Sequence, residues 1–347
     1  MPRMKNILTC IKAGPGRVEL ARVDLPDPGP GQALVRMTLS TICGSDLHIR
    51  DDIPEVPAGM PMGHEGVGVI EAVGPGVERF KPGDRVVACC LQSCGTCEEC
   101  TTVDPSVCST HGAPMNLIFG AQGEAFMVGG ADHTLAKVPM SVRDREAVLA
   151  ADVLSTGFGA IERAGVKPGQ SVAVFAQGPV GLCATLAAKH YGAETIIAVE
   201  SVTARGAIAK RLGATHVVDP AEAVPRILEI TSGKGVHVAV EALGKQQTFE
   251  NCCRTVRFGG VISSVGVYGG IPALALPTDG TFFHRSIVTT FCPAGSKRVA
   301  DLLGLIERGR IDPSPLVTHT MKLADVVSAY DLFAARKDGC VKIAVVP

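Results

Sequence analysis

Four cysteines lie within fifteen residues of one another, in a stretch whose glycine and proline residues are typical of a loop. Their pattern is C-x2-C-x2-C-x7-C, formed by Cys94, Cys97, Cys100 and Cys108. Four soft thiolates at this spacing match a closed tetrahedral zinc site. The first three also match the opening of the bacterial ferredoxin motif, but that motif closes with C-x3-C-P, whereas Ser109 follows the last cysteine here. The pattern therefore favours a structural zinc over an iron–sulfur cluster or disulfides.

A second set of metal-binding side chains is dispersed along the chain. Cys43 begins the segment Cys-Gly-Ser-Asp-Leu-His, His64 and Glu65 follow Gly63, and Asp152 lies much later. A catalytic zinc takes three protein ligands and keeps one position open for water or substrate. Each residue alone also has an ordinary interpretation, because a lone cysteine is usually a small core residue and a lone histidine a structural one. Spacing alone does not join these residues into one site.

A glycine-rich turn in the middle of the chain has the context of a phosphate-binding loop. A strand expected at Ser171 to Phe175 leads into Ala-Gln-Gly178-Pro179-Val180-Gly181 and then a helix. Small residues there let the backbone approach a pyrophosphate, and the helix N-terminus supplies free N–H groups. The first glycine of G-x-G-x-x-G is replaced by Ala176, so an ordinary turn of an α/β sheet is the competing interpretation.

Glu200 strengthens the dinucleotide interpretation because it ends the second expected strand, nineteen residues after Gly181. A dinucleotide-binding fold places an acid there to accept hydrogen bonds from the adenosine ribose, and a carboxylate repels a 2′-phosphate. We therefore expect NAD rather than NADP, with Arg205, Lys210 and Arg211 acting against this preference. The competing interpretation of Glu200 is a solvated carboxylate at a strand end.

Two patterns of elements divide the chain. Up to about residue 155, turns separate short β-branched runs, which predict strands at Gln32 to Leu39, Gly66 to Val73, Arg85 to Cys90 and Glu124 to Val128. From about residue 165, strands alternate with helices, which predicts a parallel sheet covered by helices. The strands are expected at 171–175, 195–199, 215–218, 236–241 and 260–265, and the helices at 180–190, 203–212, 224–230 and 246–256. The tail carries helices near 299–308 and 324–336 and a strand at 341–346.

Composition excludes several classes of protein. With 347 residues, of which 46% are hydrophobic and 19% charged, we expect two globular domains. Thirty-three basic residues balance thirty-four acidic ones, and this near neutrality argues against nucleic acid as a main partner. No apolar run approaches the roughly 20 residues of a membrane-spanning helix. The odd count of thirteen cysteines, with no signal segment, indicates reduced thiols and a cytoplasmic protein.

Taken together, these motifs resemble the zinc-dependent medium-chain alcohol dehydrogenase family along essentially the whole chain. The resemblance rests on motifs that agree in order and separation: Cys43 to His48, Gly63 to Gly66 with Gly68, Glu71 to Gly74, Gly83 to Val86, the four cysteines, Asp152 with Ser155 to Gly157, and Gly178 to Gly181. Asp152 and the segment Ser155 to Phe158 resemble the bacterial secondary-alcohol dehydrogenase branch. Unlike some members of that branch, this chain keeps all four structural cysteines.

The resemblance implies an α/β protein with a GroES-like, partly open β-barrel as its catalytic domain and a doubly wound Rossmann domain for the cofactor. The catalytic domain would comprise residues 1–155 and 296–347, with the structural-zinc lobe at 94–108, and the cofactor domain residues 156–295. The active site would lie in the cleft between them. Cys43, His64 and Asp152 would bind the catalytic zinc, with Glu65 as an outer carboxylate or an exchanging fourth ligand.

The family resemblance also implies roles for other residues. Ser45 would take the alcohol proton and pass it through the cofactor ribose to His48. Further cofactor contacts would come from Thr156, the backbone of Val265 to Val267, and Lys342. Their ordinary interpretations are a helix cap, a buried strand and a surface cation. Most of the remaining cysteines would be core residues, but Cys90 would face the substrate pocket together with Phe291 or Cys292.

We therefore expect an NAD-dependent enzyme with two zinc ions per chain, which interconverts a secondary or primary alcohol and its ketone or aldehyde. The closest alternative is a related dehydrogenase for polyols, amino alcohols or aldehydes. A nucleotide-binding relative without catalysis is disfavoured, because such a protein has no reason to retain both the zinc ligands and the proton relay. Resemblance also implies a homo-oligomer, a tetramer or a dimer.

Overall fold

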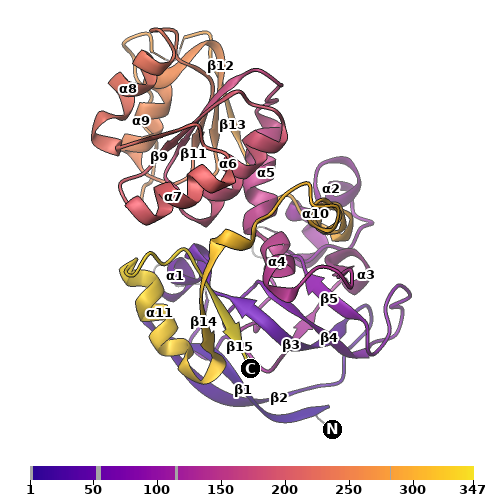
Figure 1. Ribbon diagram of the computed structural model, residues 1–347. Coiled ribbons are helices and arrows are strands. Elements are labelled where there is room, and N and C mark those ends of the chain that lie inside the picture. The colour runs from indigo at the N-terminus through magenta and orange to yellow at the C-terminus, as the bar shows by residue number, and fades with distance from the viewer. Residues whose placement is uncertain (1–2, 52–55, 114–115, 282) are drawn as a thin grey trace. The chain divides into compact units, whose positions relative to one another are not determined.

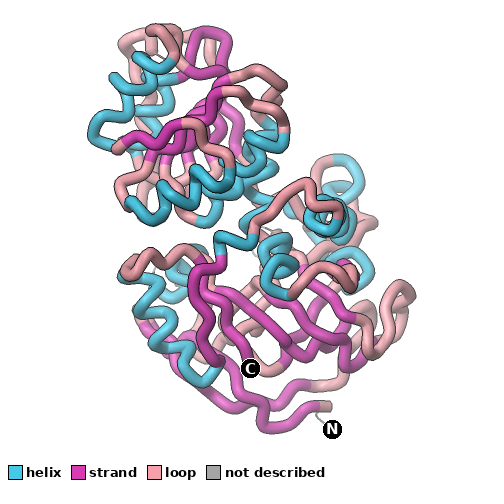
Figure 2. The backbone as a smooth tube through the Cα atoms, in the orientation of Figure 1, coloured by secondary structure: helices cyan, strands magenta, loops and turns pink. Residues whose placement is uncertain are grey.

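The computed structural model describes residues 3–51, 56–113, 116–281 and 283–347, which form two compact units (Figures 1 and 2). The first unit comprises residues 1–155, 292–309 and 317–347, and the second comprises residues 156–291 and 310–316. The chain returns to the first unit four residues earlier than expected. The reason is that Cys292 and Ala294 contact Cys90 and Asp104 of the first unit.

The first unit is built on a mixed sheet in the order β14-β15-β3-β4-β5-β7, with β6 also paired to β3. A separate β1-β2 hairpin joins this unit through bridges at Thr9 and Ile11. The strands are β1 (Met4–Gly14), β2 (Arg17–Leu25), β3 (Ala33–Thr41), β4 (Gly66–Val73), β5 (Arg85–Ala88), β6 (Ala125–Val128), β7 (Leu135–Lys137), β14 (Val317–Lys322) and β15 (Lys342–Val346). The helices are α1 (Gly44–Asp51), α2 (Glu98–Thr102), α3 (Ala131–Thr134), α4 (Asp144–Ala147), α10 (Ser296–Glu307) and α11 (Val326–Ala335).

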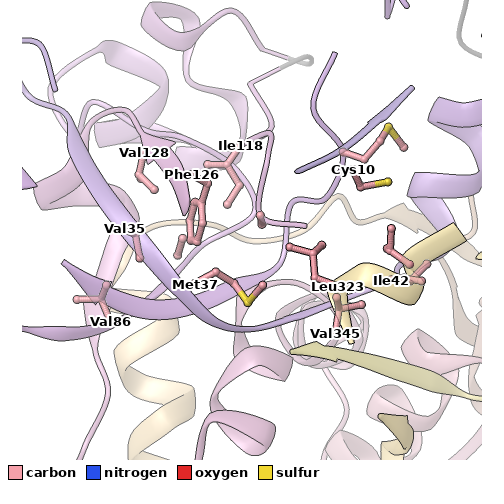
Figure 3. Packing of buried hydrophobic residues seen from close by; sticks show 14 of the residues in the cluster. Cys10, Val35, Met37, Ile42, Val86, Ile118, Phe126, Val128, Leu323 and Val345 are labelled. Carbon is pink, nitrogen blue, oxygen red and sulfur yellow. The ribbon is translucent and has the colours of Figure 1, made fainter. Parts of the chain in front are cut away.

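Apolar side chains from several strands form the core of the first unit (Figure 3). Met37 of β3, Phe126 of β6 and Val345 of β15 are almost fully buried in it. Burial of such side chains contributes about 1.5–3 kcal/mol each. The core therefore fixes β3 and β4, whose ends carry the residues described in the next subsection.

The second unit contains a parallel six-stranded sheet in the order β10-β9-β8-β11-β12-β13. This order confirms the predicted doubly wound sheet. The chain adds strands toward one edge from β8 to β10 and toward the other edge from β11 to β13, so the strand order reverses between β8 and β11. The strands are β8 (Ser171–Phe175), β9 (Thr195–Val199), β10 (His216–Val218), β11 (Val236–Glu241), β12 (Val256–Ser264) and β13 (Ser286–Thr289). The helices are α5 (Val153–Arg163), whose first turn belongs to the first unit, α6 (Pro179–His190), α7 (Thr203–Leu212), α8 (Ala223–Ile230) and α9 (Gln246–Thr255).

Continuous apolar runs explain why these strands are buried on both faces. In β8 the sequence Ser-Val-Ala-Val-Phe has four consecutive buried residues, as expected for a strand covered by helices on each side. Ile227 of α8 and Phe249 of α9 pack on one face, beside Phe175. Among the described residues, no helix has the length and apolar character needed to cross a bilayer.

Candidate functional site

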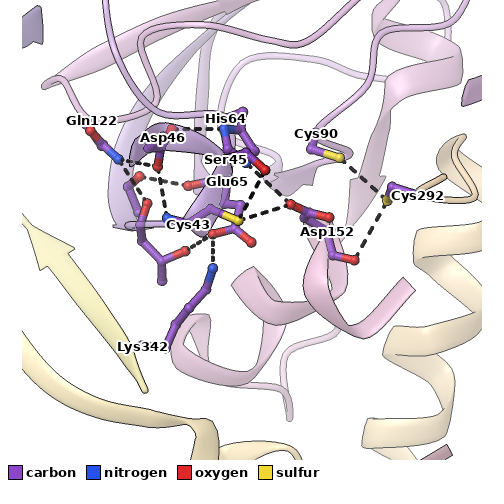
Figure 4. Close-up of polar contacts among 12 residues, drawn as sticks. Cys43, Ser45, Asp46, His64, Glu65, Cys90, Gln122, Asp152, Cys292 and Lys342 are labelled. Atoms are coloured by element: carbon purple, nitrogen blue, oxygen red, sulfur yellow. Dashed lines mark hydrogen bonds and ion pairs between the residues drawn. The ribbon is translucent and has the colours of Figure 1, made fainter. Parts of the chain in front are cut away.

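The dispersed metal-binding residues Cys43, His64 and Asp152 converge in the first unit (Figure 4). Cys43 follows β3, His64 precedes β4, and Asp152 precedes α5, so the ends of three elements meet at this point. The Cys43 Sγ atom lies 3.5 Å from Asp152 Oδ2, and His64 Nε2 lies 3.3 Å from the same oxygen. All three side chains have little or no exposure to solvent.

These three side chains fit a zinc ion. Zinc–ligand bonds of about 2.0–2.3 Å in tetrahedral geometry put neighbouring ligand atoms about 3.3–3.8 Å apart, and the separations above fall in that range. His64 Nε2 is buried, and its approach to Asp152 Oδ2 at 3.3 Å does not have the geometry of a hydrogen bond. A buried imidazole nitrogen without a hydrogen-bond partner is costly unless it binds something else, so the chemistry of this site suits a metal.

Asp46 contacts this cluster, although sequence analysis assigned it no role beyond its place in the motif. Its Oδ1 atom lies 3.0 Å from His64 Nδ1, and its Oδ2 atom accepts hydrogen bonds from Cys43 N at 2.9 Å and Gln122 Nε2 at 3.0 Å. Tyr330 of α11 donates to Gln122 Oε1 at 2.8 Å. A carboxylate behind a ligating histidine orients the ring and raises its basicity. Burial opposes this effect on the pKa of His64, but Asp46 and Asp152 raise the pKa overall.

Glu65 and Lys342 form an ion pair with no exposure to solvent behind the same cluster. Glu65 Oε2 also accepts a hydrogen bond from Thr41, whereas Oε1 has no hydrogen bond within the described chain. Burial alone would lower the pKa of Lys342, but Cys43, Glu65 and Asp152 raise it, so the ammonium stays charged. The structure thus places Lys342 against Glu65 instead of on the surface. Contact of Lys342 with a cofactor stays a prediction.

Ser45 and His48 lie three residues apart on α1. Residues at this spacing share one face of a helix. Ser45 Oγ is 3.8 Å from Cys43 Sγ, and both Ser45 and His48 are partly exposed. This hydroxyl is therefore next to a zinc-ligand candidate, and the imidazole lies one helical turn further on, where solvent can reach it.

Two cysteines of the expected substrate pocket also meet beside Asp152. Cys90 Sγ lies 3.6 Å from Cys292 Sγ, and Cys292 Sγ lies 3.7 Å from the main-chain oxygen of Asp152. Contacts with Cys292 and Cys89, together with burial, raise the pKa of Cys90, so its thiol stays protonated at neutral pH. Phe291 is half exposed and belongs to the second unit.

The sulfur atoms of the four clustered cysteines lie within 4.8 Å of one another, in the segment between β5 and β6 that contains α2. Cys94 Sγ lies 4.0 Å from Cys100 Sγ, and Cys97 Sγ lies 3.8 Å from Cys108 Sγ. These separations suit sulfur ligands on a tetrahedral zinc, which are about 3.8 Å apart. Gly95 has φ +72°, and a Cβ there would lie 2.1 Å from His133 Nδ1, so this turn requires glycine.

Main-chain N–H groups stabilise the thiolate form of Cys94. Thr96 N and Cys97 N donate to Cys94 Sγ at 3.4 and 3.3 Å. Burial would raise the pKa of Cys94, but hydrogen bonds from Thr110 and Thr96 lower it to about 5, which favours the thiolate. Thiolates are the form of cysteine that binds zinc.

The glycine-rich turn has the geometry of a phosphate-binding loop. Gly178 caps the N-terminus of α6, and open space lies where its Cβ would be, so a ligand can reach the main chain. A Cβ on Gly181 would lie 2.0 Å from Ala176 O, so this helix and strand can pack only with glycine there. Ala176 itself has φ +72°. Ala176, which occupies the position of the first glycine in the motif, therefore has a strained backbone conformation that glycine would adopt without strain.

Glu200 is partly buried and holds this turn in place. Its carboxylate accepts hydrogen bonds from Gln177 N, Ser201 N and Val202 N, each at 2.9 Å. It is therefore not a fully solvated carboxylate, and it links the end of β9 to the glycine-rich turn. Two carboxylate oxygens offer about four acceptor positions, so room for a ribose hydroxyl remains.

The other expected cofactor residues lie in the second unit. Thr156 is buried on α5, and Arg205 is partly exposed on α7. Val265 N donates to Glu241 O at 2.9 Å after β12, and Val267 is more than half exposed. Their contacts with a cofactor stay predictions.

Comparisons with known proteins identify the family. Residues 29–140 match the alcohol dehydrogenase GroES-like domain, and residues 179–308 match the zinc-binding dehydrogenase family. An alcohol dehydrogenase of Cupriavidus necator is 41% identical over 96% of both chains. This chain belongs to the zinc-dependent medium-chain alcohol dehydrogenase family. The predicted fold, a GroES-like domain joined to a Rossmann domain, is thereby confirmed.

Other members of the zinc-dependent alcohol dehydrogenase family extend this result. The NADP-dependent isopropanol dehydrogenase of Thermoanaerobacter brockii is 34% identical over 95% of this chain and 97% of its own. The solved alcohol dehydrogenase TADH of Thermus sp. ATN1 has a TM-score of 0.89 and 32% identity, covering 98% of this chain and 99% of its own. These likenesses cover both units, so the whole chain is an alcohol dehydrogenase.

Proposed function

We propose that this alcohol dehydrogenase uses NAD and two zinc ions per chain to interconvert a secondary or primary alcohol and its ketone or aldehyde. The convergence of Cys43, His64 and Asp152 is the observation that carries the proposal. The test is a panel of alcohols and carbonyl compounds, scored by the change in nicotinamide absorbance. Reduction of NAD by at least one secondary or primary alcohol is expected, and no reaction with any of them would contradict the proposal.

The residues of the catalytic cluster have distinct roles in this proposal. When bound, zinc supplies Lewis acidity toward the alcohol or carbonyl oxygen, and nicotinamide takes up or returns the hydride. Cys43, His64 and Asp152 hold the metal, and Asp46 fixes the His64 ring from behind. Ser45, whose hydroxyl is next to the ligand set, would accept the alcohol proton while it passes its own hydroxyl proton on toward His48, and His48 would release a proton to solvent.

Cys90 and Cys292 are proposed to shape the substrate pocket. Both thiols are buried beside Asp152, and the raised pKa of Cys90 keeps that thiol uncharged. Thiols at such a surface act as small apolar groups, so they favour an apolar part of the alcohol. Phe291 is retained as a pocket candidate from sequence analysis.

The metal content of the chain should be two zinc ions. We expect plasma emission spectrometry to find two per chain in the purified protein and one in either Cys43→Ser or Cys97→Ser. Each substitution removes one ligand from one set, and the other set is independent. Cys340→Ser, which changes a buried cysteine outside both sets, should keep two. A content of one zinc ion per chain in the unmodified protein would contradict one of the two zinc assignments. A content of no zinc would contradict both assignments.

The preference for NAD should depend on Glu200. The expected result is a higher kcat/KM for NAD than for NADP, and a loss of about tenfold or more in that preference in Glu200→Gln. The amide removes the charge that repels a 2′-phosphate, while its oxygen can still accept the main-chain hydrogen bonds. Glu194→Gln, at an exposed position before β9, serves as the control. A wild-type preference for NADP would mean that Arg205 and its basic neighbours outweigh Glu200.

A further inference from the structure

A hollow of about 350 Å³ lies in the second unit at the amino ends of β11 and β12. It is lined by the turn before β11, the end of α9, the start of β12 and the residue before β13. The phosphate loop at Gly178 follows the carboxyl end of β8, which runs parallel to these strands. Since β11 has six residues, the hollow is about 20 Å from the level of that loop. It is therefore separate from the dinucleotide site.

Four cations line this hollow, and no carboxylate does. They are Lys234, Arg254, Arg257 and Arg285. Arg254 has a loose, exposed ion pair with Asp279 at 3.8 Å, whose stabilisation is small. Within the described part of the chain, no carboxylate lies within 4 Å of the other three cations. Four clustered positive charges with one distant counter-charge raise the energy of the empty site, and a bound anion would relieve this repulsion.

Two of the guanidinium groups are held in place by the protein. Arg285 donates from Nε to Val256 O at 2.9 Å and from Nη1 to Phe283 O at 3.0 Å, and it stacks 4.6 Å from the centre of the Phe258 ring. These contacts use only two of its five N–H groups. The others are free of protein acceptors in the described chain, so Arg285 enters a complex already oriented.

Arg257 is oriented by a neutral histidine. Its Nη1 atom lies 2.9 Å from His237 Nε2, and since a guanidinium can only donate, that nitrogen must be the acceptor. His237 Nδ1 lies 2.8 Å from Ser171 Oγ and 3.1 Å from Ser171 N, so Ser171 holds the ring in place. Burial and the charge of Arg257 lower the pKa of His237, so the ring stays neutral at pH 7. Arg257 is therefore fixed without losing its positive charge.

We propose that this hollow binds a small molecule carrying a phosphate or diphosphate group. Oriented guanidinium groups bind phosphate oxygens in pairs, and Lys234 adds a point charge. A group with two or more negative charges matches a cluster of cations better than a single carboxylate does. The ring of Phe258 is 66% exposed and offers an apolar surface for the organic part of a phosphate ester.

Calorimetric titration of the zinc-loaded protein, saturated with the nicotinamide dinucleotide that it uses, tests the proposal. Saturation blocks the phosphate loop, so inorganic pyrophosphate, the first probe, can reach only other sites. We expect saturable binding of one pyrophosphate per chain, weakened about tenfold or more in the double variant Lys234→Gln/Arg257→Gln. Arg310→Gln, an exposed arginine of the same unit outside the hollow, should bind as the wild type does. Alcohol oxidation in phosphate-free buffer should be unchanged in both.

Other outcomes are equally informative. Absence of saturable binding at millimolar pyrophosphate would overturn the proposal, as would equal weakening in Arg310→Gln, which would indicate diffuse charge attraction. Phenyl phosphate distinguishes the two sources of the phosphate group. If Phe258→Ala weakens phenyl phosphate but not pyrophosphate, the ligand is an organic phosphate. If pyrophosphate binds and phenyl phosphate does not, the ligand is inorganic. Either result supports a phosphate site in this hollow.

Discussion

Replacing Cys43 with alanine is expected to lower kcat/KM for alcohol oxidation by about 1,000-fold or more while the chain stays folded. The same loss is expected for His64→Ala. Each change removes one of three ligand atoms that lie within 4.8 Å of one another, and the metal charge contributes several kcal/mol to catalysis. Steady-state rates with the best alcohol of the panel, together with circular dichroism, measure activity and folding separately.

Cys252→Ala provides the matched control for the loss of a buried thiol. Cys252 is fully buried on α9 in the second unit, outside every cluster of metal donors in the described chain. Its rate should stay within about twofold of the wild type, since only a small core contact is lost. Full turnover in folded Cys43→Ala or His64→Ala would show that the catalytic zinc has been assigned to the wrong residues.

Lys342→Met is expected to destabilise the protein by about 3–5 kcal/mol, because it leaves the buried carboxylate of Glu65 without its partner. The double variant Glu65→Gln/Lys342→Met should recover much of this loss, since it buries no charge. Urea unfolding followed by circular dichroism gives the free energies. Lys337→Met, at an exposed position after α11, controls for the loss of a lysine.

Comparing the three variants distinguishes a buried ion pair from ordinary packing. A loss below about 1 kcal/mol in Lys342→Met would mean that the ammonium and carboxylate are solvated in solution. Equal losses in the single and double variants would mean that the packing of the lysine side chain, and not its charge, stabilises this region.

The second unit was more predictable from sequence than the first. Its sheet was predicted nearly strand by strand, because continuous apolar runs such as β8 and β9 alternate with helical segments. The helix α5 was missed, because Gly157 and β-branched residues give it low helix propensity. A Cβ on Gly157 would lie 2.4 Å from Cys183 Cβ, so close packing against α6 requires this glycine. The helix α5 is therefore stabilised by packing against α6 and not by the helix propensity of its own residues.

The hairpin of β1 and β2 was missed for another reason. Charged residues are frequent along β2, and its side chains are mostly exposed or partly exposed, so the apolar alternation that marks a strand is weak. The second unit's last strand, β13, is equally short of buried residues. Strands β2 and β13 are defined by main-chain hydrogen bonds to a neighbouring strand, and such bonds do not require a particular type of side chain.

The site could be predicted by its residue types but not by its geometry. Spacing indicated the four-cysteine cluster, because its members are close in sequence. The ligand set required the family resemblance, since Cys43 and Asp152 are 109 residues apart. The pairing of Lys342 with Glu65 spans 277 residues, and a lysine at the start of an apolar strand gives no sign that it is fully buried.

The chain of contacts from Tyr330 through Gln122 to Asp46 has a consequence for how this enzyme tolerates change. Tyr330 belongs to α11, and its ring is part of the hydrophobic core, yet its hydroxyl helps to hold the carboxylate behind His64. Variation in the packing of this helix therefore also alters the support of a metal ligand. A substitution at Tyr330 must preserve both the packing of the core and the hydrogen bond that supports Asp46. A change that lowers the stability of the fold there is therefore expected to weaken metal binding as well.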